Sequence, residues 1–451
     1  MPVTRGVIPS SNGATAAGVA PVARAAAVTG GAAVAILALG HTLVDLYGNF
    51  VTPLLPRFTE LWGLSSTSLG LLAAATSLTG SLLQPVFGFY LDRRGTSRLA
   101  ALSLLWIAAS ITALGWVPSF AALFALAAIS VLGSAVYHPL GATLALRVAP
   151  PDRRGLYMSF YMNVGNMGWA IAPLLVAWYV TAFGLRALGW LILPGLAGAA
   201  ALAALRLSLA DQPPPLVDAL PPNASEGGVA EPAEQETAAH RPLADVQPPL
   251  PSRRVRHQGV ALLVAATTLR SWVATGIQTY LPLYLVQQGH SLAWAGGALT
   301  AFILSGTLAG FLVGYLSDRW DRRALYVWTL LLAAAAFSWF LHAPSAWTGA
   351  AIVLAGAALL GSIPLTVLLV QEMLPRHTGV GSGLVIGFAG GAGGLMVLLS
   401  GALADRLGLR AALGWLVPLL PLAALLAWAI PASVCGGRSR PAAEATGARR
   451  T

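Results

Sequence analysis

The sequence predicts an all-α membrane protein in which twelve transmembrane helices form two similar halves of six. Hydrophobic residues make up 57% of the 451 residues and charged residues only 9%, whereas a soluble domain carries roughly 25% charged residues. The apolar residues are concentrated in windows long enough to cross a bilayer, and segments of the first half return in the second. We therefore expect lipid to surround most of this chain.

Each predicted helix corresponds to one apolar window. In the first half the windows cover residues 30–56, 67–91, 97–117, 120–147, 154–183 and 187–207. In the second half they cover residues 258–287, 293–317, 324–343, 346–374, 379–404 and 411–432. A helix needs roughly 20 predominantly apolar residues to cross the hydrocarbon core, and each window is close to that length or longer.

The remaining stretches are predicted to lack a fold of their own. Residues 1–29 are rich in alanine and glycine and lack the short apolar core of a signal peptide, so we expect a disordered tail. Residues 208–257 contain three consecutive prolines and a glutamate-rich stretch, and cannot bury enough apolar surface to fold. They are the predicted linker between a half at 30–207 and a half at 258–432, and residues 433–451 form a second tail.

Arginine placement predicts the orientation in the membrane. The chain has a net charge of +10 and contains no lysine. With the N-terminus inside, the inner loops hold most of the arginines, and the outer loops keep only Arg57, Arg186, Arg406 and Arg410. Because positive residues favour the cytoplasmic side, we expect a multi-pass protein of the inner (plasma) membrane with both termini and the linker in the cytoplasm. In a chain this apolar, the positive charge indicates orientation and not nucleic-acid binding.

The internal repeat is clearest in a turn that follows an apolar window in each half. Residues 88–98 contain Asp92 followed by arginines, and a similar acid-and-arginine turn returns at 314–323. The acids of the two turns, Asp92 and Asp318, are 226 residues apart. The segment Gly-Leu-Arg-Ala occurs at 184–187 and again at 408–411, which is an offset of 224 residues. A near-constant offset indicates two copies of one six-helix unit, which would enclose a central cavity.

The duplicated turn resembles the signature of the major facilitator superfamily. Four motifs are further similar to those of the fosmidomycin resistance protein family: His41-Thr-Leu-Val-Asp45, Gln84-Pro-Val-Phe-Gly88, Gly133-Ser-Ala-Val-Tyr-His-Pro139 and Gln371-Glu-Met-Leu-Pro375. The resemblance runs from about residue 35 to residue 430 and omits the linker. That family usually has an acidic residue after the His-Pro pair, where this chain has Leu140.

This resemblance implies the major facilitator fold and a secondary active transporter, in which proton-coupled antiport drives efflux of a small polar or anionic compound or drug by alternating access. Two alternatives stay open: proton-coupled uptake of an organic anion, and a membrane sensor that does not transport. An enzyme is not expected, because the sequence has no His-Glu-x-x-His motif and no nucleophile elbow. We expect a monomer without cofactor or metal, whose partners are the substrate, protons and the lipid bilayer.

Asp45 is the first candidate for proton coupling. It falls near the middle of the first predicted helix, where a charge costs about 2.5–3.5 kcal/mol on insertion scales, and such acids usually have a function. His41, a further candidate for proton coupling, and Asn49, a candidate substrate contact, lie four residues to either side and share its helix face. His138, next to a helix-bending proline, is a second candidate proton carrier. The alternative is that Asp45 only hydrogen-bonds a neighbouring helix and that His138 only fixes the bend.

Arg270 is the corresponding candidate for substrate binding in the second half. The repeat places it one residue from the equivalent of Asp45, and Gln278 extends its helix face. A guanidinium can donate two parallel hydrogen bonds to a carboxylate, phosphate or phosphonate. The alternative is a structural ion pair with Asp45.

Four further residues complete the candidate site. Tyr137, Asn163 and Asn166 are candidate substrate contacts, with lipid exposure or helix–helix hydrogen bonding as their alternatives. Glu372 is a candidate gate residue that would pair with an arginine of a neighbouring inner loop, and a solvated carboxylate is the alternative. The two signature turns would form a conformational latch, through Gly88, Asp92, Arg93, Arg98, Gly314, Asp318, Arg319 and Arg323.

Overall fold

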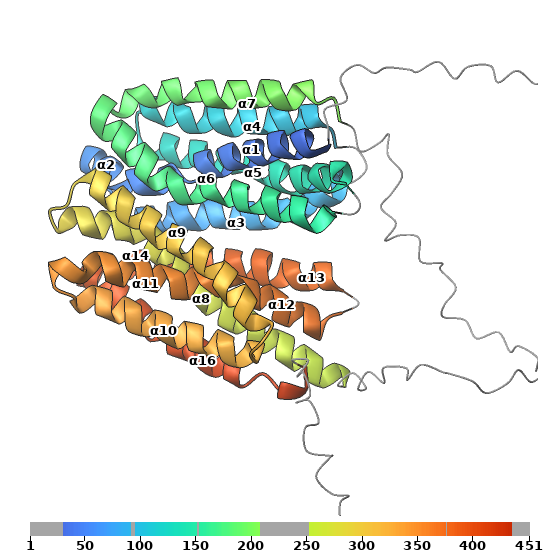
Figure 1. Cartoon of the computed structure of the whole chain (residues 1–451). Helices are drawn as coiled ribbons and strands as arrows, with labels where there is room; N and C mark the ends of the chain where they lie inside the picture. Colours follow the sequence, from blue (N-terminus) through green and yellow to red (C-terminus); the bar gives the residue numbers. More distant parts are fainter. Residues whose placement is uncertain (1–29, 92–94, 151–152, 208–251, 376, 435–451) are drawn as a thin grey trace, which may run out of the picture.

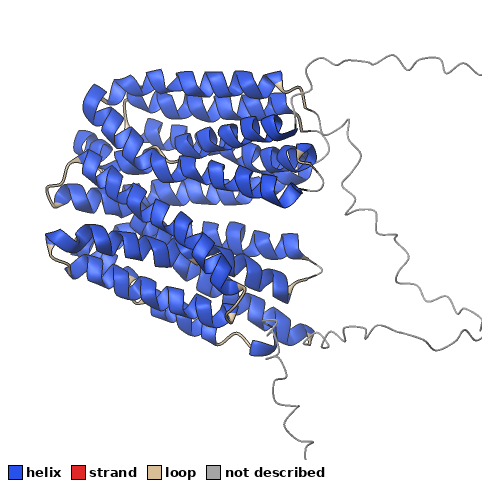
Figure 2. Ribbon diagram, in the orientation of Figure 1, coloured by secondary structure: helices blue, strands red, loops and turns tan. Residues whose placement is uncertain are grey.

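The computed structural model describes residues 30–91, 95–150, 153–207, 252–375 and 377–434 (Figure 1). Figure 2 shows that helices make up nearly all of these residues and that short loops join them. The predicted tails at 1–29 and 435–451, and most of the linker, lie outside the described residues.

The first half contains six membrane-spanning segments. They are α1 Gly30–Gly48 with α2 Val51–Trp62, α3 Ser66–Leu91, α4 Ser97–Thr112 with η1 Ala113–Trp116, α5 Phe120–Val148, α6 Arg154–Phe183, and η3 Leu185–Leu191 with α7 Ile192–Ala204. Serine and threonine begin several of these helices: the side chains of Thr96 and Ser119 accept hydrogen bonds from the backbone at the starts of α4 and α5.

The second half repeats this order. Its segments are α8 Arg253–Gln287, α9 Leu292–Ser317, α10 Arg322–His342, η5 Ser345–Trp347 with α11 Thr348–Gly361 and α12 Ile363–Met373, α13 Thr378–Ser382 with the π-helical turn η6 Gly383–Phe388 and α14 Ala389–Leu407, and α15 Leu409–Leu416 with α16 Leu419–Trp428, followed by the short turn η7 Ala432–Val434. Helix α8 begins at Arg253, five residues before the predicted start at 258, because Ser252 caps its N-terminus.

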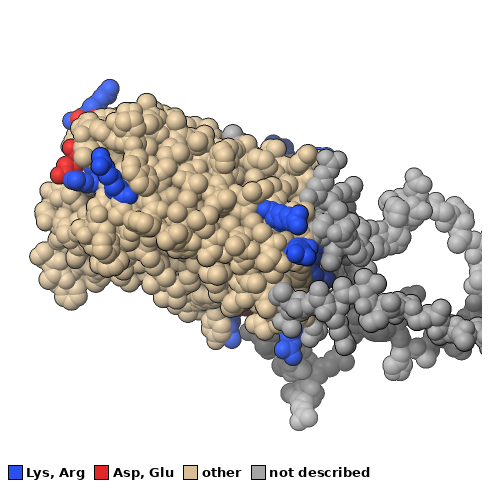
Figure 3. Space-filling view, turned by 90° about the horizontal axis from the view of Figure 1, so that it is seen from above, with Lys and Arg blue, Asp and Glu red and all other residues tan. Residues whose placement is uncertain are grey.

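The predicted all-α membrane class is confirmed. Eleven helical segments of the described chain are long and apolar enough to cross a bilayer. Helix α3, with 26 residues, rises about 39 Å and takes the place of the twelfth. On the face seen in Figure 3, arginine side chains gather towards both ends of the molecule and acidic side chains at one end, and the band between them shows almost none.

Two pairs of glycines with positive φ explain why part of the internal repeat is kept in the sequence. Gly63 and Gly289 follow the first segment of each half with φ of 61° and 89°. Gly184 and Gly408 follow the fifth segment of each half with φ of 80° and 84°. Residues with a Cβ rarely adopt positive φ, so both copies keep glycine where the chain reverses.

The two halves contact each other through α3 with α14 and through α6 with α9. We call the end of the bundle where α1 and α8 begin the linker end, and the end where α2, α6 and α14 finish the far end. At the far end Asp405 of α14 accepts hydrogen bonds from Ser66 N at 2.7 Å and from Thr67 N at 2.9 Å. The hydroxyl of Tyr280 also donates to the Ser66 carbonyl at 3.0 Å. These contacts join the two halves at the far end.

Glycines allow the close approach of α3 and α14. A Cβ at Gly394 would lie 2.3 Å from the side chain of Ser77, and a Cβ at Gly401 would lie 2.4 Å from the Ser66 carbonyl oxygen. Small residues at helix–helix contacts are typical of membrane proteins, since they let backbones approach closely.

Candidate functional site

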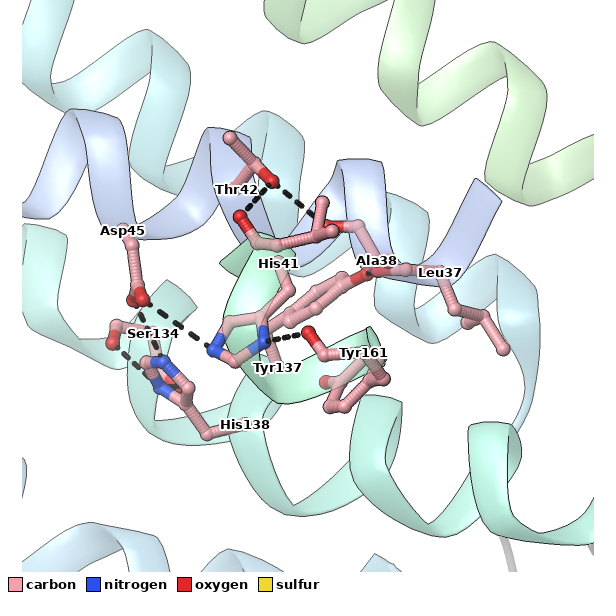
Figure 4. Close-up of polar contacts among 10 residues, drawn as sticks. Leu37, Ala38, His41, Thr42, Asp45, Ser134, Tyr137, His138 and Tyr161 are labelled. Carbon is pink, nitrogen blue, oxygen red and sulfur yellow. Dashed lines mark hydrogen bonds and ion pairs between the residues drawn. The ribbon is translucent and has the colours of Figure 1, made fainter. Parts of the chain in front are cut away.

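The strongest concentration of ionisable groups inside the first half joins Asp45 and His41 of α1 to His138 of α5, and we call it the His–Asp cluster (Figure 4). One carboxylate oxygen of Asp45 lies 2.8 Å from Nε2 of His138, and the other lies 3.4 Å from Nε2 of His41. The side chains are 14%, 27% and 3% exposed for Asp45, His138 and His41. The predicted proton-coupling residues are therefore in direct contact.

The second ring nitrogen of each histidine faces a backbone carbonyl. Nδ1 of His138 lies 2.9 Å from the Ser134 carbonyl, and Nδ1 of His41 lies 3.3 Å from the Tyr161 carbonyl (Figure 4). A carbonyl oxygen can accept a hydrogen bond from a proton on Nδ1, whereas the Ser134 hydroxyl, 3.0 Å from Nδ1 of His138, can donate to a bare Nδ1. In a neutral ring with its proton on Nδ1, Nε2 presents a lone pair, and both Nε2 atoms face the carboxylate of Asp45.

Three acceptors therefore converge on one place when both rings are neutral with the proton on Nδ1 and Asp45 is ionised. Such an arrangement is repulsive until a cation enters it. A proton on Nε2 of either histidine makes a charge-assisted hydrogen bond to Asp45 and removes the net negative charge. The three groups each offer one ligand atom, all within 4.8 Å of one another, so a divalent cation is the chemical alternative to the proton.

Aromatic rings and a glycine hold His41 in place. Its ring stacks on Tyr161 of α6 with centroids 4.8 Å apart and meets His138 edge-on at 5.0 Å. A Cβ at Gly165 would lie 2.0 Å from Nδ1 of His41, so only glycine lets α6 come this close. On α5, Pro139 lies inside the continuous helix next to His138, and a proline there removes one backbone hydrogen bond.

Two predicted substrate contacts have structural roles in this structure, which corrects the expectation from sequence. The Tyr137 side chain is fully buried, and its hydroxyl donates to the Leu37 carbonyl at 2.7 Å, so it faces neither lipid nor a cavity. The Asn49 side-chain amide donates to the Trp169 carbonyl at 2.9 Å, which joins α1 to α6. Both side chains hold the first half together.

Arg270 is separated from the His–Asp cluster. Its guanidinium donates to the Ser271 hydroxyl at 3.2 Å and lies beside Tyr326 of α10. It makes no ion pair with Asp45, which pairs with the two histidines instead, so the alternative of a structural Asp45–Arg270 pair is wrong for this conformation. The residue is 6% exposed, and its Nε has no hydrogen-bond partner among the described residues. The Tyr326 hydroxyl lies beside Thr267 and the Arg270 guanidinium, and the hydroxyls of Thr267 and Tyr326 are both buried.

Two cavities lie close to the contact between the halves. The first, of about 250 Å³, is bounded by α1, α2, α3, α4 and α5 and by Thr279 of α8, and we call it the hydroxyl cavity for its serines and threonines: Thr52, Thr76, Ser77, Ser130, Ser134 and Thr279. The second, of about 240 Å³, lies between α6, α9, α11 and α12 and is lined by Asn163 and Asn166. Gln278 is adjacent to Thr279 and donates to the Ala274 carbonyl.

The gate and latch candidates lie at the linker end. Glu372 forms an ion pair with Arg322 of the second signature turn, which is the kind of partner that the sequence predicted. Arg322 also lies 3.6 Å from Asp318. Arg323 donates to the Ile430 carbonyl at 2.6 Å, and this bond joins α10 to the end of the same half.

The remaining latch candidates make fewer contacts among the described residues, or lie outside them. Arg319 lies over the ring of Tyr315 at 3.6 Å. Arg98 is exposed at the start of α4, and a Cβ at Gly314 would meet no atom within 4 Å. Asp92 and Arg93 lie outside the described residues, and Gly88 is described only as part of α3.

Sequence reasoning missed four residues of this site. Ser134 and Tyr161 position the two histidines through their carbonyls, and a carbonyl leaves no signal in the residue type. Arg322 was part of the predicted second signature turn, but only the fold shows that it pairs with Asp318 across the turn between α9 and α10. Asp405 was missed because its partners are 338 and 339 positions away in the sequence.

Comparisons with known proteins agree with this architecture. The family model for the Major Facilitator Superfamily matches residues 37–394 and 289–448. The fosmidomycin resistance protein of Escherichia coli (strain K12) is 28% identical over 393 residues, which is 86% of this chain and 91% of that protein. An uncharacterised MFS-type transporter of Bacillus subtilis (strain 168) is 27% identical over 397 residues, which is 88% of this chain and 92% of that protein.

Solved structures show the same fold. A bacterial homologue of the human lysosomal transporter Spinster, in an inward-facing and unoccupied conformation, matches with a TM-score of 0.69 at 16% identity, over 92% of this chain and 99% of that chain. A peptide transporter in complex with sulfate matches with a TM-score of 0.67 at 16% identity, over 89% and 95% of the two chains. These findings place the protein among membrane transporters and not enzymes. The chain belongs to the major facilitator superfamily.

Proposed function

We propose that this transporter exports a small polar compound in exchange for protons, and that the His–Asp cluster carries the coupling proton. The observation that carries the proposal is the convergence of Asp45 with two Nε2 atoms whose rings place Nδ1 within hydrogen-bond distance of backbone carbonyls. Such a cluster needs an added cation before its groups can hydrogen-bond one another. A proton coming from either side of the membrane is the smallest cation that meets this need.

The charge of the cluster explains how a proton could control the conformational change. Without an added proton, Asp45 leaves one net negative charge at membrane depth. A buried charge costs about 2.5–3.5 kcal/mol on insertion scales, so the deprotonated cluster favours the conformation in which water or a bound cation reaches it. With one proton the cluster is neutral, and the halves can rock around it at lower cost. Proton loading and release would thus alternate with the two conformations.

We base the proposed direction of transport on similar proteins, and the proposed location and orientation in the membrane on the positions of the arginines. The Escherichia coli relative is named a resistance protein, and a multidrug resistance protein of Aeromonas hydrophila is 30% identical over 143 residues. Export supports resistance, so we propose efflux across the inner membrane, with the linker end on the cytoplasmic side. Proton-coupled uptake of an anion and a non-transporting sensor are the competing functions. Arg270, a buried cation that pairs with no carboxylate among the described residues, would be the anion-binding group for the first of these.

Purified protein in liposomes loaded with a pH-sensitive dye tests the coupling. Fosmidomycin and a panel of small drugs are added, and the substrate-driven proton movement is compared between the native protein and Asp45→Asn. We expect Asp45→Asn to lose this proton movement. Glu60→Gln is the matched control, since Glu60 is an exposed acid that pairs with Arg57 at the far end, and it should behave as the native protein does.

Two results would contradict the proposal. Proton movement at the native rate in Asp45→Asn would exclude Asp45 as the carrier. Loss of transport on treatment with a chelator, with recovery on addition of Zn²⁺, would assign the cluster to a metal ion instead. A sensor would bind compounds without any flux in the native protein, and counterflow of a labelled compound separates that case from transport.

A further inference from the structure

The hydroxyl cavity has a chemistry that points to its ligand. Its described lining combines six hydroxyl side chains with apolar residues of α2, α3 and α5, and none of these lining residues is charged. It takes residues from both halves, because Thr279 belongs to α8. It also lies next to the His–Asp cluster: Gly48 follows Asp45 by one helical turn, and the Ser134 hydroxyl lies 3.0 Å from Nδ1 of His138.

Three of the six hydroxyl groups are oriented as acceptors. Thr76 donates its proton to the Leu72 carbonyl at 3.0 Å, Ser130 donates to Ala127 at 2.7 Å, and Thr279 donates to Thr275 at 2.7 Å. A hydroxyl group has one proton and two lone pairs, so these three oxygens keep only lone pairs for a ligand. At these three positions the wall offers hydrogen-bond acceptors.

This arrangement selects against anions. A carboxylate or phosphonate placed in the cavity would meet the lone pairs of Thr76, Ser130 and Thr279 and no cation among the described lining, so its desolvation would be poorly offset. Arg270 does not line the hydroxyl cavity and is buried beside Tyr326, so it supplies no positive charge to this wall. A molecule with N–H donors and an apolar body meets both the acceptors and the apolar side chains of Leu69, Leu72 and Val131.

We infer that the hydroxyl cavity binds the amine end of a small amphipathic substrate, which is protonated and carries one positive charge. This inference rests on the proposed function and names its substrate class. The negative charge of the deprotonated His–Asp cluster attracts the ammonium group, and a proton on the cluster removes that attraction. Substrate and proton then compete for the same charge, which is the requirement for exchange of one against the other.

Binding to the purified full-length protein at fixed pH tests the inference without any flux. Three probes share one carbon skeleton: 2-phenylethylamine, 2-phenylethanol and phenylacetate. Isothermal titration should rank the amine tightest, the alcohol next and the carboxylate weakest. Thr76→Val and Ser130→Ala each remove one acceptor and should weaken the amine about five- to tenfold, whereas Thr76→Ser keeps the hydroxyl and should restore most of the affinity.

Thr143→Val is the matched control. Thr143 donates to the Pro139 carbonyl at 2.9 Å on the same helix as Ser130 and lines none of the cavities described above, so the variant should bind as the native protein does. Melting temperatures of all variants confirm that each is folded. Tighter binding of phenylacetate than of the amine, or an unchanged amine affinity in both Thr76→Val and Ser130→Ala, would overturn the inference. So would a lack of binding of all three probes at millimolar concentration by folded protein.

The proposed function and this inference can fail separately. Amine binding that depends on Thr76 and Ser130, together with native proton movement in Asp45→Asn, would support the cavity and contradict the coupling residue. Loss of proton movement in Asp45→Asn, together with preferred binding of phenylacetate, would support the coupling residue and overturn the substrate class.

Discussion

The Asp405 carboxylate joins the two halves at the far end, and its removal is expected to open that end. It accepts hydrogen bonds from the backbone of Ser66 and Thr67, at 2.7 and 2.9 Å, and from the Thr67 hydroxyl at 2.5 Å. These residues begin α3, so the acid of one half caps a helix of the other. Asp405→Ala removes all three contacts, and Asp405→Asn keeps an oxygen that can accept from one donor.

The structure allows the size of the effect to be worked out. A side-chain cap is worth about 1 kcal/mol, and a negative charge at a helix N-terminus adds about 0.3–1 kcal/mol when exposed. Asp405 is exposed, so solvent screening keeps the total near the lower values. A loss of about 1–2 kcal/mol from the closed state changes its ratio to the open state roughly 5- to 30-fold. The Tyr280 contact remains in the variant, so part of the closure is kept.

Sided labelling measures this change. Thr52 lines the hydroxyl cavity, and Thr52→Cys in a Cys435→Ser background provides one reporter thiol. A membrane-impermeant maleimide is added on the far-end side of sealed vesicles. Labelling should be faster in Asp405→Ala, less so in Asp405→Asn, and unchanged in the exposed control Glu60→Ala. Equal labelling rates in the native protein and Asp405→Ala would refute the role of this contact.

Three other perturbations have expected outcomes. Gly394→Val should prevent closure of the far end, because even a Cβ there lies 2.3 Å from Ser77, and labelling of the Thr52→Cys reporter should rise; unchanged labelling would contradict the close packing. Neutralising Arg322 alone should lower the melting temperature more than neutralising it together with Glu372, since the single change removes the positive charge of Arg322 from beside a partly buried acid; a double variant less stable than both single variants would contradict this. Tyr137→Phe should lose about 1 kcal/mol of unfolding free energy and keep transport, because its hydroxyl bonds a carbonyl of α1; loss of substrate binding in a folded protein would return Tyr137 to the substrate site.

Much of the fold could be predicted because it depends on local composition. Apolar windows are nearly sufficient to locate membrane helices, since lipid requires both apolar side chains and internal backbone hydrogen bonds. The repeat could be read because positive φ requires glycine at Gly63, Gly184, Gly289 and Gly408. The start of α8 was placed too late, because arginines at its beginning made Arg253 and its neighbours look like linker.

The candidate site could be predicted only in its residue types. His41 and Asp45 share a helix face, and four-residue spacing is readable from sequence. That His138 would reach Asp45 depends on the packing of α1 against α5, which no local pattern encodes. The directions of Tyr137 and Arg270 were equally unreadable, since each faces the interior of its own half and bonds a neighbour that only the fold supplies.

The most direct test of the coupling claim compares two modes of transport in Asp45→Asn. Transport of one labelled substrate is measured in liposomes, first driven by a pH gradient and then as exchange without a gradient. Our account predicts that gradient-driven transport is lost while exchange persists, because the asparagine keeps the shape of the site and cannot take up a proton. Gradient-driven accumulation at the native level in Asp45→Asn would contradict the account.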